Sequence, residues 1–304
     1  MLIDLVYLWV DGSDKKWLAK KNAALGVARG SGVAARRWRD NDELKYSLRS
    51  VEKFAPWINH IFIITDGQRP KWLANNPKIT IVDHKEIIDE KYLPTFNSVT
   101  IESNIYKIPG LSEHFLYAND DMFFGRPVQP DFFFDKKGDP IVIVKKKRRF
   151  SLREPRSYWR KTQWNAWIFT QGITGKRNSV GIGFAHSIEP MRKSYMYETA
   201  FAIRDMNTSP FRSRLDVQRI VFPLVDNAMG RNTLRLQRYN GGFWNWLRGK
   251  TEYHNYDKRW NVYNIVMKKH PATFTLNDTG RGAKDKAFLE KLFPKKSKYE
   301  KSPR

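Results

Sequence analysis

The chain has 304 residues, of which 41% are hydrophobic and 11 are Trp, so it can bury a substantial core and its composition argues against disorder. It contains no Cys, which excludes disulfides, thiolate catalysis and zinc–thiolate sites. Lys and Arg number 55 against 31 Asp and Glu, a formal charge of +24 that attracts anionic partners such as nucleic acid, an acidic membrane surface, nucleotides or a phosphate-bearing polymer.

The first predicted element is a buried strand at residues 3–10, which is apolar except for Asp4 and ends at Asp11-Gly12. No basic leader precedes it, so we interpret Met1 as a start close to this strand rather than as part of a signal peptide. No stretch approaches the roughly 20 apolar residues of a membrane-spanning helix. We therefore expect a cytoplasmic protein.

Strands and helices then alternate along the chain. Ser13 or Asp14 can cap a helix that continues through residues 17–18, and residues 28–37 are predicted to form a loop. The following predicted elements are a helix at 40–54, strands at 60–65 and 79–82, a helix at 97–107, and strands at 115–118 and 141–144. This alternation predicts an α/β fold in which a Rossmann-like, mostly parallel sheet carries helices on both faces across residues 1–150.

The composition changes after the basic run at residues 145–149. Residues 151–270 are rich in Trp, Tyr and Arg and are expected to be mostly helical, with helices near 158–171, 192–206 and 214–227. Residues 271–304 are expected to complete the domain that carries the candidate site, with a strand at 273–276, a helix at 285–292 and a basic, frayed tail at 295–304.

Three apolar runs end abruptly in carboxylates, at Asp11, at Asn119-Asp120-Asp121 and at Asn277-Asp278. In open α/β sheets, ligands bind beyond the carboxyl ends of the strands, so these distant tips could meet at one site. Adjacent acids such as Asp120-Asp121 can bind a divalent cation, and Mg²⁺ commonly shares such carboxylates with substrate phosphates. The alternative is that each pair only forms the turn that ends a strand.

Two similar strand ends show that not every such tip can be functional. Asp66-Gly67 follows the strand predicted at 60–65, and Asp83-His84 follows the next strand. We interpret the second as structural.

Among six His, His186 is the best candidate for a general base, because neutral imidazole can accept a hydroxyl proton near pH 7. A lone His is otherwise a loop residue that hydrogen-bonds the backbone. Arg49, Arg212 and Arg214 are candidates for binding a phosphate ester, since the guanidinium presents two donors to phosphate oxygens. There is no GxxxxGK[ST] motif and no GxGxxG after the first strand, which argues against an NTPase, a kinase and a dinucleotide enzyme.

Four blocks of the sequence resemble the signature blocks of the Stealth family of sugar-1-phosphate transferases, and they occur in the family's order. This family includes bacterial capsule polymerases and the GlcNAc-1-phosphotransferase of lysosomal enzymes. The first block is IDLVYLWVDGSDKKW at residues 3–17; the second comprises residues 39–44, 46–50, 55–57, 65–68, 93–98, 108–112 and 119–121; the third comprises His186, Pro190, Phe211-Arg212 and residues 216–218; and the fourth comprises residues 276–278, 293–294 and 297–300.

The resemblance implies that the protein transfers hexose-1-phosphate from a UDP-sugar to a hydroxyl of a growing surface polysaccharide, forming a phosphodiester and releasing UMP. It also implies three groups of site residues. These are catalytic His186, Arg212 and Asp121; nucleotide-binding Asp11, Gly12, Arg49, Asn119 and Asn277; and Asp120, Asp121 and Asp278 as ligands of Mg²⁺ or Mn²⁺.

The basic excess then suits an anionic polysaccharide acceptor. Residues 145–149 and 156–167 could line a groove in which aromatic rings stack on sugars; alternatively, the Trp residues are core and the charges are solvated. Peripheral contact with the inner face of the cytoplasmic membrane is a further expectation. Two other functions remain open: a conventional glycosyltransferase that releases UDP, and a nucleic-acid-binding protein. We expect no nucleic acid, because carboxylates at several strand tips would repel it.

Overall fold

The structure, a computed structural model, describes residues 1–26, 38, 40–149, 153–176, 180–236, 253–255, 262–276 and 282–302. Its centre is a five-stranded sheet in the order β3-β2-β1-β4-β8. The four parallel strands are β1 (Ile3–Leu8), β2 (Ile61–Thr65), β3 (Ile79–Asp83) and β4 (His114–Asn119), and β8 (Glu189–Arg192) runs antiparallel to β4. The α/β fold with a mostly parallel sheet that the sequence predicts is therefore confirmed.

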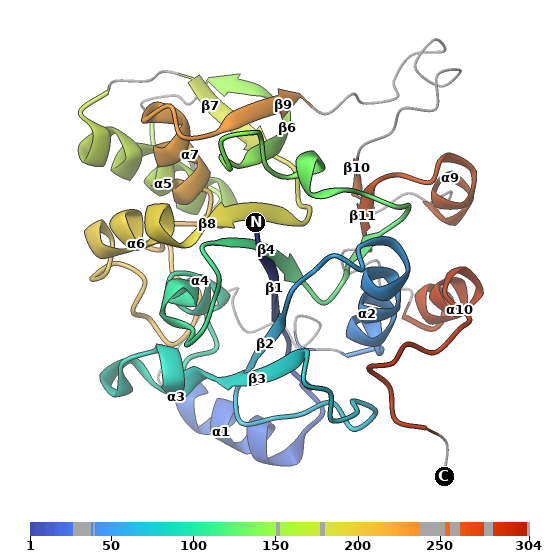
Figure 1. The fold of residues 1–304 in the computed structure, drawn as a ribbon. Coiled ribbons are helices and arrows are strands. Elements are labelled where there is room, and N and C mark those ends of the chain that lie inside the picture. The colour runs from blue at the N-terminus through green and yellow to red at the C-terminus, as the bar shows by residue number, and fades with distance from the viewer. Residues whose placement is uncertain are drawn as a thin grey trace.

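Helices cover both faces of this sheet, with α2 (Glu43–Phe54) and α10 (Gly282–Leu292) on one side and α4 (Ser98–Glu102) and α6 (Lys193–Ala202) on the other (Figure 1). Tyr7 packs with Leu48 of α2 in one core cluster, whereas the adjacent Val6 packs with Ile101 of α4 in another. Because side chains alternate between the two faces of a strand and both faces are covered, the strands are continuously apolar.

Asp4 is the exception in β1, and its carboxylate is fully buried. It accepts hydrogen bonds from the Asn59 side chain at 2.8 Å and from the Ser112 backbone N–H at 2.7 Å. These bonds compensate its burial and tie together the loops that precede β2 and β4.

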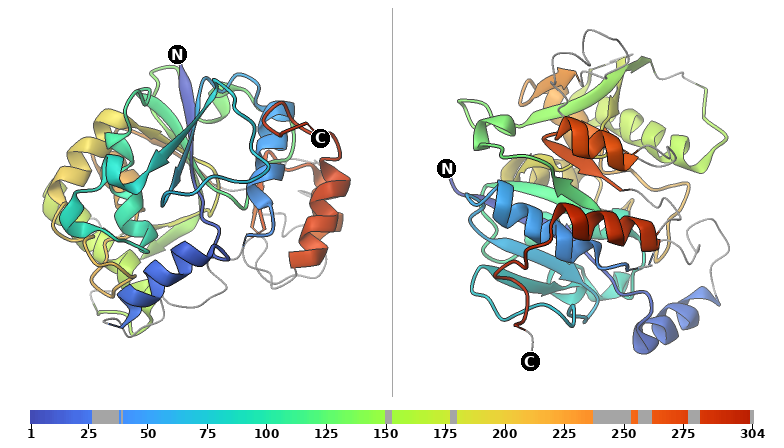
Figure 2. Two further views of the ribbon diagram at one scale, coloured as in Figure 1. Left: turned by 90° about the horizontal axis from the view of Figure 1, so that it is seen from below. Right: turned by 90° about the vertical axis from the view of Figure 1, so that its right-hand side faces the viewer.

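Two smaller sheets flank the central one, in the orders β7-β6-β9 and β10-β11-β5. Their strands are β5 (Met122–Phe124), β6 (Ile141–Arg149), β7 (Val180–Phe184), β9 (Thr233–Leu236), β10 (Tyr253–Asn255) and β11 (Thr273–Thr275). The remaining helices are α1 (Lys15–Leu25), α3 (His84–Ile87), α5 (Tyr158–Thr174), α7 (Val221–Ala228) and α9 (Val262–Lys269), with short 3₁₀ turns at Glu90–Tyr92, Ile105–Lys107 and Pro130–Phe132. In the right-hand view of Figure 2, the N-terminus and α1 lie at opposite ends of the molecule.

The second half of the chain contains the three helices predicted near 158–171, 192–206 and 214–227, as α5, α6 and α7. It also contributes strands that were not predicted. These strands are only three to five residues long, and β7 and β8 include Gly or Pro, so their hydrophobic pattern is too short to distinguish a strand from a turn. Since β8 pairs with β4 and β6 pairs with β7 and β9, strand pairing crosses residue 150.

The predicted fraying of the tail at 295–304 is wrong for residues 299–301. The Tyr299 side chain is buried, its carbonyl accepts the Ala74 N–H at 2.9 Å, and the Lys301 N–H donates to the Trp72 carbonyl at 2.9 Å. A basic composition suggested solvent exposure, but one buried ring and an edge pairing with residue 73 hold the segment in place. The predicted loop at 28–37 lies outside the described residues.

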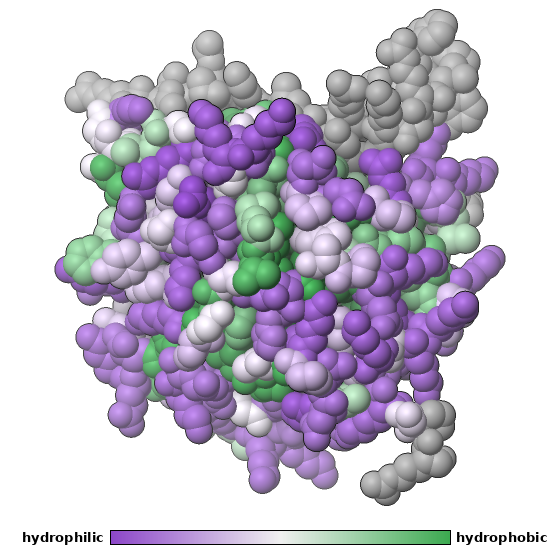
Figure 3. Space-filling model, in the orientation of Figure 1, coloured by the Kyte–Doolittle hydropathy of each residue, from purple (hydrophilic) through white to green (hydrophobic). Residues whose placement is uncertain are grey.

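The face seen in Figure 3 is mostly hydrophilic, with small apolar areas between polar side chains. Among the helices of the described residues, none combines the length and apolar character that crossing a membrane requires.

Asp226 on α7 is buried, and its Oδ1 has no hydrogen-bond partner within the described part of the chain. Burial raises the pKa of this carboxyl to about 7, and the nearby Arg231 only partly opposes the effect. The folded protein therefore keeps a proton on Asp226 that the unfolded chain releases around its ordinary value of 3.8.

The wild type should become less stable as pH rises from 3.8 to about 7, because folded Asp226 keeps its proton over this range. We expect Asp226→Asn, which has no such proton, not to show this decrease. Urea denaturation at pH 5 and pH 8 should show the variant losing about 2 kcal/mol less than the wild type over this interval. Asp205→Asn, at an exposed turn, is the control and should follow the wild type. An Asp226→Asn protein with the wild-type pH dependence would contradict the raised pKa.

Candidate active site

The turn after β1 is held against two other segments. The Gly12 N–H donates to the Trp38 carbonyl at 2.8 Å, and a Cβ added at Gly12 would lie 2.0 Å from that oxygen, so only Gly fits. The Asp11 N–H donates to Gln68 Oε1, and Gln68 Nε2 donates to the Asp11 carbonyl, both at 2.9 Å. This reciprocal pair joins the carboxyl ends of β1 and β2.

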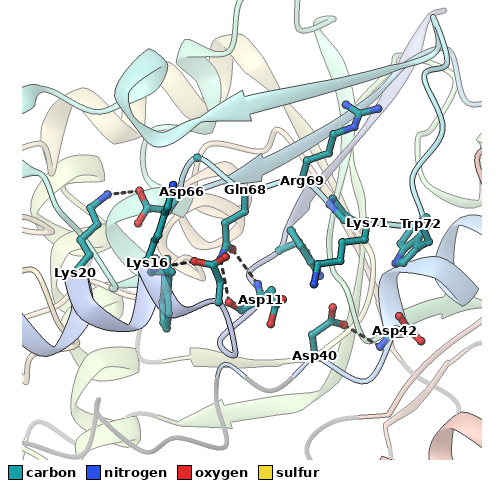
Figure 4. Close-up of a pocket in the computed structure, with 15 residues that line it drawn as sticks. Asp11, Lys16, Lys20, Asp40, Asp42, Asp66, Gln68, Arg69, Lys71 and Trp72 are labelled. Atoms are coloured by element: carbon teal, nitrogen blue, oxygen red, sulfur yellow. Dashed lines mark hydrogen bonds and ion pairs between the residues drawn. The ribbon is translucent and has the colours of Figure 1, made fainter.

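A hollow of about 540 Å³ opens at these strand ends. Figure 4 shows carboxylates from the β1 and β2 turns and from the segment before α2 around it, while Arg69 points away. Trp9, Trp17 and Trp72 also line it. Its described charged lining includes Asp11, Asp40, Asp42, Asp66, Lys20 and Lys71.

The carboxylates at this end of the sheet influence one another. Burial, together with the charges of Glu43, Asp42 and Asp11, raises the pKa of Asp40 to about 6. Burial, followed by Asp121, Glu43 and Asp40, raises the pKa of Asp120 well above its usual range. The ends of β1 and β4 and the start of α2 thus form one acidic group, as the parallel pairing of Leu8 with Asn119 requires.

Backbone contacts bring Asp121 and His186 to the same place, although 65 positions separate them in the sequence. The Asp121 carbonyl accepts the Leu276 N–H at 3.0 Å, and the Thr275 hydroxyl donates to the His186 carbonyl at 2.7 Å. The hydroxyls of Ser187 and Thr273 add a contact of 2.9 Å. Three segments predicted to contribute to one site therefore meet here. Asn277 and Asp278, directly after Leu276, lie outside the described residues.

Arg212 is positioned by a different set of contacts. Its guanidinium donates to Ser98 Oγ at 2.5 Å, at the start of α4, and lies 5.9 Å from the ring of Trp159. The preceding Phe211 stacks on Phe96 with a centroid distance of 5.2 Å, and Phe96 meets Trp17, which lines the hollow. Arg212 thus belongs to the same end of the sheet, but neither it nor Asp121 nor His186 is among the described residues that line the hollow.

The chain matches conserved region 1 of the Stealth proteins over residues 1–26 and conserved region 2 over residues 37–142. It is 34% identical over 255 residues to the capsular polysaccharide phosphotransferase fcs1 of Haemophilus influenzae, covering 82% of this chain and 66% of that protein. The chain belongs to the Stealth family. It is also 42% identical to the exopolysaccharide phosphotransferase CpsY of Mycobacterium tuberculosis, over 71% of this chain and 42% of that protein.

An exopolysaccharide phosphotransferase of Streptomyces coelicolor is 53% identical over 138 residues, which cover 45% of this chain and 24% of that protein. This Stealth protein thus spans between 24% and 66% of the length of these three relatives. Among solved structures, the galactosyltransferase LgtC aligns with this chain at 10% sequence identity and a TM-score of 0.45. The alignment covers 97% of this chain and 98% of the LgtC chain.

Arg49 of this Stealth protein lies within an ion-pair network, away from the hollow. Its Nε and Nη2 donate to the two carboxylate oxygens of Glu300 at 2.7 and 2.8 Å, and its Nη1 donates to the Phe293 carbonyl at 2.6 Å. The guanidinium also lies over the ring of Tyr46. These contacts occupy the donors that the predicted phosphate contact would use, and they give Arg49 a structural role. Glu300 and Phe293 both belong to sequence blocks that resemble the family. The resemblance alone therefore did not distinguish a structural role of Arg49 from a role in binding the nucleotide.

Several residues around the hollow were not predicted as site residues. In the sequence, Asp40 is only the first residue of the helix predicted at 40–54, and Asp66 is only one strand tip among several. Gln68 follows Asp66 by two positions, and its amide bridges to Asp11. An available signal was the parallel order of β1 and β2, because adjacent parallel strands place their following turns side by side. Asp83, by contrast, caps α3 and is structural, as expected.

We expect Arg49→Met to destabilise the protein without weakening nucleotide binding. The change leaves the Glu300 carboxylate buried without its partner, which should lower the free energy of unfolding by about 3 kcal/mol in urea denaturation. Lys53→Met, on the exposed face of the same helix, should change it by less than about 0.5 kcal/mol. If Arg49→Met kept full stability and bound UDP tenfold more weakly in calorimetric titration, the structural role would be refuted.

Proposed function

We propose that this protein transfers hexose-1-phosphate from a UDP-sugar to a hydroxyl of a growing surface polysaccharide, forming a phosphodiester and releasing UMP. The observation that carries the proposal is the meeting of the segments of Asp121 and His186 through residues 273–276, beside a hollow of about 540 Å³ at the strand ends. The names of the relatives, which are polysaccharide phosphotransferases, support the same reaction class.

The hollow suits a nucleoside diphosphate. Trp72, which is only partly buried, offers a ring for the base, and Lys16 and Lys71 offer charges for phosphates, whereas Lys20 pairs with Asp66. In this proposal, Asp11 and Gly12 contact the nucleotide from the end of β1, and Asn119 contacts it from the end of β4. The diphosphate would then point toward Asp120 and Asp121.

The described residues include no group of three or more His, Asp or Glu side chains placed to hold a metal ion together. Mg²⁺, however, usually takes only one or two protein carboxylates and completes its shell with water and substrate phosphates. The Asp120-Asp121 pair fits that ligand set, and a cation would oppose both the burial and the repulsion from nearby carboxylates that raise the pKa of Asp120. We propose that these two residues, with Asp278, hold Mg²⁺ or Mn²⁺, which neutralises the diphosphate charge.

The proposed reaction is a single displacement at the β-phosphorus. His186 takes the proton of the acceptor hydroxyl as that oxygen forms a bond to phosphorus. The bond between the β-phosphorus and the bridging oxygen breaks, and the oxygen leaves with UMP. Arg212 offsets charge on the phosphoryl oxygens, and positioning supplies most of the remaining rate, as phosphoryl transfer generally requires.

The acceptor is proposed to be an anionic polysaccharide, in keeping with the formal charge of +24. Trp159 is half exposed beside Arg212 and could stack on a sugar ring, whereas Trp167 is buried in the core. Of the groove expected along residues 156–167, the side chain of Trp167 is therefore not part. The side chains of residues 145–149 lie outside the described set, and contact with the membrane surface remains a proposal.

Incubation of the protein with a panel of UDP-hexoses, Mg²⁺ and polysaccharide acceptor should release UMP for one of the donors, as measured by chromatography of the nucleotides. The reaction should stop when the cation is removed with EDTA and resume when Mg²⁺ is restored. Release of UDP would contradict the proposal and identify a conventional glycosyltransferase. Salt-sensitive DNA binding without any turnover would favour a nucleic-acid-binding protein.

The same assay tests the proposed base. His186→Ala should lower the rate of UMP release on the order of 10²–10³-fold, because the hydroxyl loses its proton acceptor. His60→Ala, whose imidazole contacts only Thr80 and Phe62 in the described structure near the opposite end of β2, should keep the wild-type rate. A His186→Ala protein with near-normal turnover would exclude His186 as the base.

A further inference from the structure

The segments that carry the proposed catalytic side chains meet a second time inside the protein, around Arg219. Its Nη2 lies 3.2 Å from Glu189 Oε1, and its Nε lies 3.8 Å from Glu102 Oε2. The guanidinium carbon lies 4.2 Å from the ring centroid of Tyr117. All four side chains are buried, so solvent does not weaken these contacts.

Each neighbour of Arg219 leads to a different part of the candidate site. Glu189 begins β8, three residues after His186. Tyr117 lies on β4, and its hydroxyl is 2.7 Å from Asn119 Oδ1, next to Asp120-Asp121. That hydroxyl is also 2.9 Å from Glu102 Oε1.

Glu102, the third neighbour, and the chain segment that contains Arg219 are both connected to Arg212. Glu102 lies on α4, one turn after Ser98, which accepts the hydrogen bond from Arg212. Arg219 itself follows Arg212 by seven residues on one connection, which Asn97 fastens through the Phe211 carbonyl and the Asp216 carboxylate. Arg219 therefore contacts the strand after the proposed base, the strand before the acidic pair and the helix that holds the proposed arginine.

Stability alone does not account for such a group. Burying one guanidinium and two carboxylates costs desolvation, and apolar replacements of buried ion groups are often neutral or stabilising. Here Arg219 Nε and Nη1 also lack hydrogen-bond partners among the described residues, which adds to the cost. A buried charged group is best attested where it fixes one arrangement among several.

We propose that Arg219 is a positioning residue for the transfer reaction, holding the segments of His186, Asp120-Asp121 and Arg212 in one fixed arrangement through Glu189, Tyr117 and Glu102. This inference rests on the proposed function. Arg219 does not touch the substrates; it acts through its buried neighbours.

The chain contains a matched control at the other end of the same pair of strands. Arg192 pairs across from His114, while Glu189 pairs across from Tyr117. Arg192 also lies between two carboxylates, 3.0 Å from Glu113 and 3.3 Å from Asp139, and its guanidinium lies 4.3 Å from the ring centroid of Tyr195. It therefore repeats the same grouping of an arginine, two carboxylates and a Tyr ring at a partly exposed position away from the candidate site.

The test compares Arg219→Lys, the neutral triple variant Arg219→Met/Glu102→Gln/Glu189→Gln, and Arg192→Met. The triple variant avoids leaving two buried carboxylates without a cation, so it should fold even if Arg219→Met alone does not. We expect kcat for UMP release to fall on the order of 10–100-fold in the triple variant, with the donor KM nearly unchanged and Tm retained. Arg219→Lys, which keeps the charge, should recover part of the loss, and Arg192→Met should keep wild-type kcat.

A second readout does not depend on the proposed reaction. In isotope-labelled protein, the NMR signals of the His186 imidazole and the Arg212 guanidinium should shift or broaden in the triple variant and stay unchanged in Arg192→Met. A folded triple variant with wild-type kcat and unchanged signals would overturn the positioning role. If the wild type releases no UMP while the signals respond as expected, the proposed function fails and the positioning of these side chains stands.

Discussion

Two hydrogen bonds from one short segment tie together the two loops that carry the acidic pair and the proposed base. The Leu276 N–H donates to the Asp121 carbonyl, and the Thr275 hydroxyl donates to the His186 carbonyl. The β11 segment therefore places the turn after β4 beside the approach to β8, although neither lies near β11 in the sequence. A strand that returns late in the chain thus completes a site whose other described parts lie between residues 11 and 212. These bonds add to the pairing of β4 with β8, in which Tyr117 lies opposite Glu189 and which places both loops at the same end of the sheet.

The charge distribution gives this arrangement its chemical character. The protein has a formal charge of +24, yet carboxylates collect where β1, β4 and α2 meet. Burial, and then their mutual repulsion, raises the pKa of Asp40 and of Asp120, so the fold holds these groups together against their preference for solvent. Such an acidic group in a basic protein suits a cation that bridges to a phosphorylated substrate. Basic side chains also line the hollow, and Arg212 lies beside Trp159.

Much of the central sheet could be predicted because its strands are buried on both faces and end in turn residues. Residues 3–10, 60–65, 79–82 and 115–118 became β1 to β4, with boundaries that differ by at most two residues at either end. The strands β5, β7 and β8 were missed because they are short and depend on partners far along the chain. For the same reason, no local pattern distinguished Arg49, which pairs with Glu300, from an arginine that binds phosphate. Arg219 carried no sequence signal, since its three neighbours come from three different elements. The sequence therefore indicated the residues at the strand ends. It could not indicate which distant strands and side chains pair with one another.

The central claim is that one site, formed at the ends of β1 and β4 and completed by the segment of His186, binds the nucleotide and directs its phosphate to the acidic pair. A crystal structure of the protein with UMP and Mg²⁺ tests it most directly. The account predicts that the nucleoside occupies the hollow beside Asp11 and Gln68, with the phosphate and the cation at Asp120-Asp121 and facing His186. A nucleotide bound on another face, or one in the hollow whose phosphate points away from both Asp121 and His186, would contradict it.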